Sequence, residues 1–221
     1  MIFFFADNHY GAAPGRNIYG SLPETLRSRI CFREDDWTLL EAGEWADECE
    51  LLVLDMIGDT CGIPHPGKGA EQAVRRYLEQ GGSVLLLHGS SAAFWQWPWW
   101  RKIVGLRWVR PNDPDGVEAS THPVKPCLLR PCKVRHPLAA GMQSIQLPRD
   151  EIYISLEQVS PVTVLMDVCI EEGVFPQCFE NLTPWGGRFC HFLPGHSPEV
   201  TTNPEIIKVI SCLAEYLLKE V

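Results

Sequence analysis

The chain has 221 residues, of which 45% are hydrophobic and 21% are charged. This length and composition fit one α/β domain, spanning residues 1–221, that buries its own core without disulfides or metals. The net charge of −9 argues against nonspecific binding to nucleic acid or to an anionic membrane, because such binding needs clustered Lys and Arg side chains. A small-molecule partner is therefore expected.

The cysteines indicate the compartment. There are nine, an odd number, and the closest two, Cys127 and Cys132, are five residues apart. This spacing argues against both a disulfide framework and a zinc knuckle, and it favours free thiols in a reducing cytosol. Residues 1–6 are too short and too uncharged for a signal peptide, and no stretch approaches the roughly 18 apolar residues of a membrane span. We expect a cytoplasmic protein.

Three short apolar runs in the first half, residues 2–6, 51–55 and 83–87, are each followed by a turn or a helix. Their hydrophobicity is continuous rather than alternating, which is typical of parallel strands covered by helices on both faces. Residues 70–78 keep helical spacing between the second and third runs, and Gly81 and Gly82 are suited to end that helix. The pattern predicts a βαβ unit.

The second half is less regular. After about residue 109, seven prolines up to Pro148 break any long helix, so an irregular excursion with short strands is expected. Strand-forming residues return at 162–168 and 187–193. A last helix is predicted to begin at Asn203, an N-cap residue followed by Pro204.

Ligands of open parallel sheets bind outside the carboxyl ends of the strands, so the residues after each predicted strand are site candidates. The three predicted strands are followed by Asp7-Asn8-His9-Tyr10, by Asp55-Met56-Ile57-Gly58-Asp59 and by His88-Gly89-Ser90-Ser91. The alternative for each is an ordinary solvated turn, which favours the same residue types.

The third of these turns is the most informative. A class I glutamine amidotransferase would place a nucleophilic Cys at this strand-to-helix elbow, whereas this chain has His88, Gly89 and Ser90 there. No glutaminase activity is therefore expected. The segment that follows resembles the ThuA-like (trehalose utilisation) family, which has a Gly-Gly strand ending in Leu-His, then an aromatic helix with Trp-Pro-Trp. The matching residues are Gly81, Gly82, Leu87, His88, Phe94, Trp97, Pro98, Trp99 and Gly105.

Four more segments resemble the same family, in the family's order: His136 to Met142, Arg149 to Tyr153, Gly186 to Phe189 and Leu193 to His196. The family also has a His-Pro pair after its aromatic helix; here Arg110-Pro111 stands at that position, with His122-Pro123 as the alternative. The resemblance implies a flavodoxin-like, class I glutamine amidotransferase-like three-layer domain with a mostly parallel central sheet. It also implies a role in carbohydrate catabolism, with a homo-oligomer left open.

The resemblance and the strand-end positions together suggest catalytic roles for three residues. His88 is the candidate for proton transfer at neutral pH, and Glu151 is the candidate general base. The turn at Pro194 and Gly195 should aim His196 at the mouth of the site. His88 and Glu151 are expected at turns or strand ends rather than in the core, so their replacement should spare stability. A purely structural role is the alternative for each.

Substrate contacts are expected from His9, Asp55, Trp97, His136 and Tyr153, with the tryptophan offering a flat apolar face to a pyranose ring. A divalent metal is a further possibility if His88, His136, His196 and Glu151 converge. Two functions remain open. One is an enzyme that performs acid-base chemistry on trehalose, a related disaccharide or a keto-sugar, and the other is a non-catalytic binding or scaffolding domain.

Overall fold

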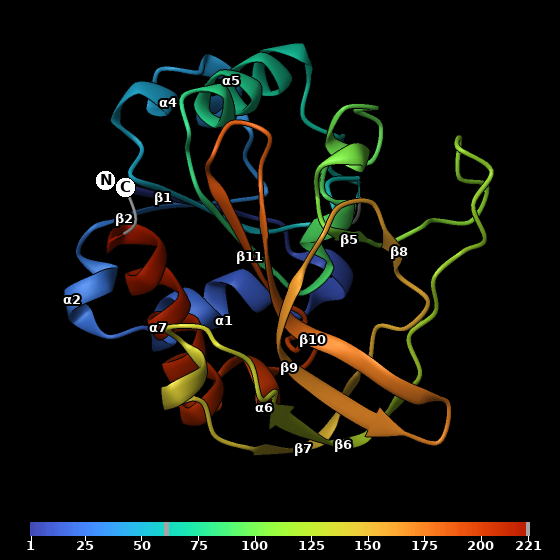
Figure 1. The fold of residues 1–221 in the computed structure, drawn as a ribbon. Helices are drawn as coiled ribbons and strands as arrows, with labels where there is room; N and C mark the ends of the chain where they lie inside the picture. The colour runs from blue at the N-terminus through green and yellow to red at the C-terminus, as the bar shows by residue number, and fades with distance from the viewer. Residues whose placement is uncertain (60–61, 220–221) are drawn as a thin grey trace.

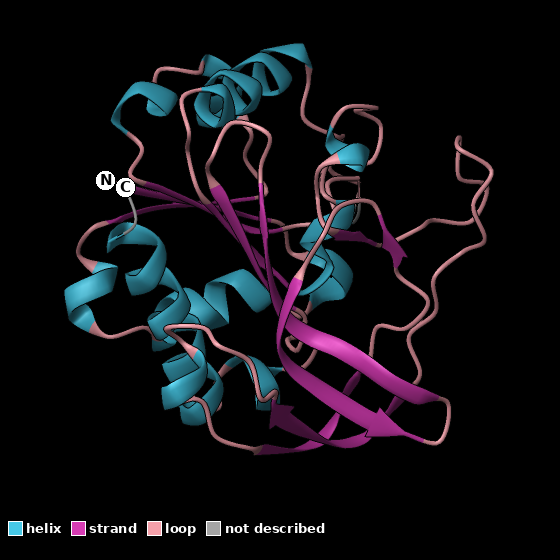
Figure 2. Ribbon diagram, in the orientation of Figure 1, coloured by secondary structure: helices cyan, strands magenta, loops and turns pink. Residues whose placement is uncertain are grey.

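The computed structural model describes residues 1–59 and 62–219, and over these residues one large sheet forms the centre of the molecule (Figures 1 and 2). Its strand order is β2-β1-β3-β4-β11-β10-β9-β6-β7. The strands are β1 (Ile2–Ala6), β2 (Ile30–Glu34), β3 (Leu51–Asp55), β4 (Val84–Leu87), β6 (Val124–Pro131), β7 (Ile145–Glu151), β9 (Thr163–Ile170), β10 (Gly173–Leu182) and β11 (Arg188–Phe192). A separate small ladder pairs β5 (Leu106–Arg107) with β8 (Glu157–Gln158).

The sheet has a parallel half and an antiparallel half. Strands β2, β1, β3, β4 and β11 are all parallel to one another, in the 2-1-3-4-5 order of flavodoxin-like folds. Strands β10, β9, β6 and β7 extend this sheet with antiparallel pairings. The expected α/β fold is confirmed, and its parallel core carries an antiparallel extension.

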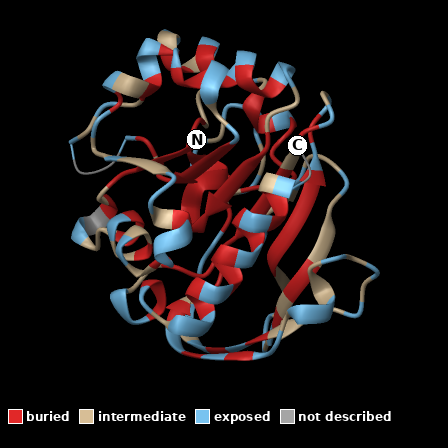
Figure 3. Cartoon of the chain, turned by 90° about the vertical axis from the view of Figure 1, so that its left-hand side faces the viewer, coloured by how far each residue is buried: buried red, intermediate tan, exposed pale blue. Residues whose placement is uncertain are grey.

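Helices cover the two faces of the parallel half (Figure 1). On one face lie α1 (Pro14–Ser21), α2 (Glu24–Arg27), α6 (Pro198–Thr201) and α7 (Pro204–Lys219), and on the other lie α3 (Thr38–Ala42), α4 (Trp45–Glu48) and α5 (Lys68–Glu79). Alternate residues of each strand therefore enter different cores: Phe4 packs toward α1 and α7, whereas Phe3 and Phe5 contact Trp45 of α4. Strands β1, β3, β4 and nearly all of β11 are buried on both faces, whereas the edge strand β2 is only partly buried (Figure 3).

Most predicted elements are present. The runs at 2–6 and 51–55 coincide with β1 and β3, and Asn203 caps α7 by accepting a hydrogen bond from the Glu205 amide at 2.8 Å. Gly81 ends α5 at φ +86°. The proline-rich excursion is more regular than expected, because it includes the antiparallel strands β6 and β7. Pro148 lies in the edge strand β7, and Pro126 lies at a register shift in the β6–β7 pairing, two places where a missing amide donor costs least.

The prediction of an aromatic helix after β4 is wrong. The chain there forms two short 3-10 turns, η2 (His88–Ala92) and η3 (Trp100–Lys102), joined by irregular turns. Pro98 supplies no amide donor in the middle of this segment, which is unfavourable for a continuous helix. The aromatic rings nevertheless pack together, with Phe94 and Trp97 stacked at 3.9 Å and Trp100 against Phe189 of β11.

Two glycine pairs that the family resemblance singled out pack against each other at the start of β4 and of β11. A Cβ atom on Gly187 would lie only 2.1 Å from the Gly82 carbonyl oxygen and 2.7 Å from that of Gly81. Because backbone cannot move aside as a side-chain tip can, we expect Gly187→Ala to lower the free energy of unfolding by about 2 to 3 kcal/mol. Chemical denaturation measures this, with Gly141→Ala as control, since its Cβ would meet nothing within 4 Å. Equal effects of the two substitutions would contradict the close approach.

Candidate functional site

A cleft of about 630 Å³ lies at the carboxyl ends of the parallel strands, where the loops after β3, β4 and β11 meet the end of β7. The proline-rich segment between β5 and β6 forms its outer wall. The lining residues are Ile57, His88, Gly89, Ala92, Trp108, Arg110, Pro111, Ser120, Thr121, His122, Glu151, Tyr153 and His196. Four of these are histidine or glutamate, so the cleft combines proton-transfer groups with aromatic and apolar walls.

His88 occupies the elbow that directly follows β4. Its φ of +47° is in the left-handed region, which is unfavourable for a residue with a side chain and is often found at functional sites. The ring is buried, and Nδ1 donates a hydrogen bond to the Leu193 carbonyl at 3.0 Å. Burial, followed by the nearby positive charge of His9, lowers the pKa of His88 to about 3. The imidazole is therefore neutral at physiological pH, with Nε2 as an acceptor.

Glu151 lies at the end of β7 among three imidazoles. Its Oε2 is 3.6 Å from His88 Nε2, and its Oε1 is 3.3 Å from His196 Nδ1 and 3.4 Å from His122 Nδ1. The Tyr153 hydroxyl donates to His88 Nε2 at 3.3 Å. A carboxylate, three imidazoles and a phenol thus share one corner of the cleft, where a proton can pass between a ligand and any of several acceptors.

Asp150, the neighbour of Glu151, fixes the turn that carries His196. Its two carboxylate oxygens accept hydrogen bonds from the amides of Gly195 and His196, at 2.9 and 3.0 Å. Burial raises the pKa of Asp150 to about 6, against the lowering effect of these amide donors. Asp150 and Glu151 therefore have different roles: Asp150 positions the turn that carries His196, and Glu151 faces the His196 ring.

A second layer of ionisable groups lies behind His88. The His9 ring stacks on that of His88 at 5.6 Å, and His9 Nδ1 donates to Asp7 at 2.5 Å. The other oxygen of Asp7 accepts the amides of Ile57 and Gly58, so it also holds the loop after β3. Burial lowers the pKa of His9, but the hydrogen bond to Asp7 and the charges of the nearby carboxylates raise it more, and the net shift is upward.

Asp55 completes this layer as a fully buried carboxyl at the end of β3, and burial raises its pKa to about 7. His9 opposes this shift, while Asp7 and Glu34 add to it. Because the folded-state pKa is above the unfolded value near 4, this group favours folding at low pH, and that contribution is lost as the pH rises through 7.

We expect Asp55→Asn to remove this dependence. The unfolding free energy of the variant relative to wild type should rise between pH 5 and pH 8 by about 2 kcal/mol. Only about two of the three units of the shift titrate within this window, roughly 2.7 kcal/mol, and His9 also loses a counter-charge. Urea denaturation at the two pH values measures the difference. Because the change between the two pH values is compared, any pH-independent effect of the new amide on the unfolding free energy cancels. A difference that does not change with pH would show that Asp55 is ionised in the fold throughout this range.

The structure brings together most of the predicted site residues. His88, Glu151, His196 and Tyr153 line the cleft, and His9 and Asp55 lie in the layer behind it. Trp97 does not line it. Its side chain is buried between Phe94 and Trp99, in the core on the face of the sheet that α3, α4 and α5 cover.

His136 also lies elsewhere. Its Nε2 is 3.4 Å from a carboxylate oxygen of Glu180, and its ring packs against Tyr216 of α7. The turn before η4 (Ala139–Gly141) lies beside that helix instead of at the carboxyl ends of the parallel strands. His191 also lies in the core, where it is buried, stacks on Phe179 at 4.2 Å and contacts Asn181.

Several cleft residues were not among the predicted site residues, and His122, Trp108 and Arg110 are three of them. His122 reaches Glu151 because Thr121 forms a β-bridge with Ile154, which places the excursion against the end of β7. Trp108 packs on Tyr153 at 4.8 Å, and Arg110 is paired with Asp59 at 3.0 Å. In the sequence, the His122-Pro123 pair was the signal that could have identified His122 as a cleft residue.

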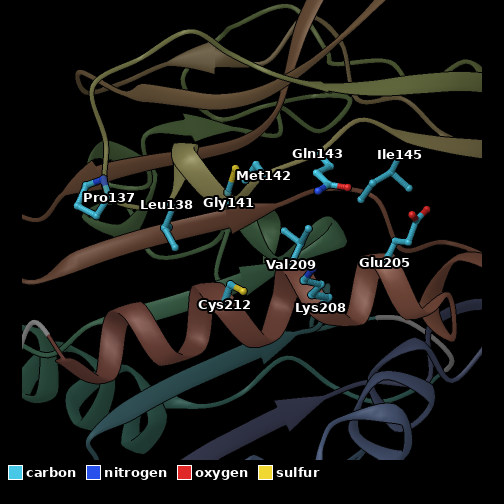
Figure 4. Close-up of a pocket in the computed structure, with 10 residues that line it drawn as sticks. All are labelled: Pro137, Leu138, Gly141, Met142, Gln143, Ile145, Glu205, Lys208, Val209 and Cys212. Carbon is cyan, nitrogen blue, oxygen red and sulfur yellow. The ribbon is translucent and has the colours of Figure 1, made fainter.

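A second pocket of about 260 Å³ lies between residues 137–145 and α7 (Figure 4). It is lined by Pro137, Leu138, Gly141, Met142, Gln143, Ile145, Glu205, Lys208, Val209 and Cys212. This lining is largely apolar and includes no histidine, so the cleft at the strand ends is the better candidate for chemistry.

The comparison with protein families identifies the chain. The family described as ThuA, trehalose utilisation, matches residues 59–216, which is most of the sequence. This chain belongs to the ThuA family. The resemblance expected from its sequence segments is thus confirmed. A search of curated proteins finds no match.

Solved structures support the fold of this ThuA-family protein. A ThuA-like protein from Parabacteroides merdae is similar over 98% of this chain and 88% of its own, with a TM-score of 0.76 and 18% identity. A β-galactosidase from Bacillus circulans sp. alkalophilus is similar over 97% of this chain but only 31% of its own, with a TM-score of 0.53 and 10% identity. At such identities the likeness shows a shared fold. Among the described residues, no helix is long and apolar enough to cross a membrane.

Proposed function

We propose that this ThuA-family protein is an enzyme of carbohydrate catabolism that transfers a proton to or from a disaccharide or its keto derivative in the strand-end cleft. The observation that carries the proposal is the position of Glu151, whose carboxylate faces the imidazoles of His88, His122 and His196 at 3.3 to 3.6 Å. Such a cluster holds several acceptors and donors within reach of one bound ligand.

The cleft suits a sugar in size and in surface. Its volume of about 630 Å³ lies within the usual range of small-molecule sites. Trp108 and Tyr153 form an aromatic wall that offers a flat apolar surface to the C–H face of a pyranose. Arg110, Ser120 and Thr121 add polar groups for sugar hydroxyls.

The elbow supports a reaction other than glutamine hydrolysis. His88 stands where an amidotransferase of this fold would need its Cys nucleophile, and none of the described residues that line the cleft is a cysteine. In the proposed reaction, neutral His88 and Tyr153 hold and exchange a proton with the ligand, Glu151 accepts it, and His196 completes the polar side of the cleft. A domain that binds a sugar without changing it is the alternative.

The test is a panel of trehalose, sucrose and their 3-keto forms, with glutamine as the comparison substrate. Consumption of at least one sugar, without release of glutamate, is the expected result. If a sugar binds in calorimetry but is not consumed, and Glu151→Gln binds it equally well, the protein is a binding module. If none of the sugars binds or reacts, the proposed substrate class is wrong.

A further inference from the structure

We propose that His88, Glu151 and His196 form a binding site for one divalent transition-metal cation such as Zn²⁺. One potential ligand atom from each residue lies within 4.8 Å of the other two. The inference deepens the proposed function, because the cation would face the same ligand in the same cleft. It is tested separately, because metal binding is measured without any sugar.

The spacing of the three residues fits a small coordination sphere. Tetrahedral zinc bonds of 2.0 to 2.1 Å place neighbouring ligand atoms about 3.3 Å apart. The observed spacings are close to this value, although they reach different oxygens of the carboxylate: His88 Nε2 lies 3.6 Å from Glu151 Oε2, and His196 Nδ1 lies 3.3 Å from Glu151 Oε1. The ligand atoms of the remaining pair, His88 and His196, lie within 4.8 Å of each other, and the partly exposed His196 side chain would have to move to bring them closer.

The surroundings orient these ligands as in known metal sites. Nδ1 of His88 donates to the Leu193 carbonyl, which can only accept, so the lone pair of the neutral ring lies on Nε2 and faces Glu151. The Tyr153 hydroxyl also donates to this Nε2, at 3.3 Å, and a bound cation would take the place of that hydrogen bond. Asp150 holds the backbone of the His196 turn through two amides. His88 thus has the outer hydrogen bond typical of a metal-bound histidine, and the turn that carries His196 is fixed by Asp150.

Two histidines and one glutamate form a donor set of catalytic zinc sites, which keep a fourth position open for water or substrate. A cation held there would polarise a carbonyl or hydroxyl oxygen of the sugar. His122 lies 3.4 Å from Glu151 on the excursion wall and is not needed as a ligand. It remains available to exchange a proton with the bound sugar.

The experiment uses the full chain after chelator treatment and dialysis. Calorimetric titration with Zn²⁺ is expected to show one equivalent bound, and Co²⁺ should give the visible bands of a four- or five-coordinate site. His196→Ala and Glu151→Gln should each weaken binding at least about tenfold, a loss of about 1.4 kcal/mol or more. His136→Ala is the matched control, since it removes a histidine outside the cleft. Thermal melting establishes that each variant is folded.

The outcomes separate the two proposals. Binding that is unchanged in both folded cleft variants, or a cobalt-thiolate charge-transfer band showing cysteine ligands, would overturn the metal site. So would the absence of stoichiometric binding of Zn²⁺ and Co²⁺. Metal binding that depends on His196 and Glu151 in a protein that consumes no sugar supports the site and contradicts the proposed function. Sugar turnover that persists in metal-free protein contradicts a catalytic cation.

Discussion

Glu151→Gln is expected to lower kcat/KM for the sugar substrate by about 10² to 10⁴, the usual effect of losing a general base. Glutamine keeps the shape of the side chain but removes the charge that faces the three imidazoles. The same loss follows if the carboxylate acts as a cation ligand. Steady-state kinetics on the best sugar of the panel measures the effect.

Two comparisons make this result specific. Glu118→Gln changes an exposed carboxylate of the excursion that does not line the cleft, and it should leave kcat/KM unaltered. The melting temperature of Glu151→Gln should stay near that of wild type, because no hydrophobic contact is removed. Wild-type kinetics in a folded Glu151→Gln variant would exclude this carboxylate from the reaction.

His88 is a less suitable position for testing catalysis by mutation than the sequence suggests. Its place after a strand predicts an exposed turn whose replacement spares stability. In the structure its side chain is buried, stacks on His9 and donates to Leu193. Removing the ring therefore disturbs packing as well as chemistry, and a loss of activity would have two explanations.

The parallel half of the fold could be predicted because its signals are local. Strands β1, β3 and β4 are continuous apolar runs, and α5 and α7 keep regular helical spacing with recognisable ends. Their polar residues converge because parallel strands end at one edge of the sheet. The convergence of His9, Asp55, His88 and His196 on this edge follows from that rule.

The antiparallel half depends on contacts between distant segments. Strand β10 was not predicted, and its pairing with both β9 and β11 carries the sheet beyond the parallel core. His122 reaches the site through the Thr121–Ile154 bridge, which no local pattern indicates. Trp97 and Trp108 could not be distinguished from the sequence, because residue type alone does not tell which tryptophan is in the core and which lines the cleft.

Replacing each of these two tryptophans by alanine tests that assignment, and the larger loss of stability is expected at Trp97. Its ring is buried and stacked between Phe94 and Trp99, so Trp97→Ala should cost about 3 to 5 kcal/mol of unfolding free energy. For a chain of this size that corresponds to a fall of roughly 6 to 20 °C in Tm. Below the transition, the sugar kinetics of the folded variant should be unchanged, because Trp97 does not line the cleft.

Trp108→Ala should show the reverse pattern. This ring is partly exposed and packs on Tyr153 and His122 in the cleft wall, so its loss removes a stacking surface for the sugar. KM should rise about threefold to tenfold, corresponding to the 0.5 to 1.5 kcal/mol of one aromatic contact, with a smaller fall in Tm than at Trp97. Thermal melting and kinetics on both variants provide the measurement. If Trp97→Ala raised KM while keeping its Tm, the sugar would contact the aromatic segment after β4, and the cleft would have to extend beneath it.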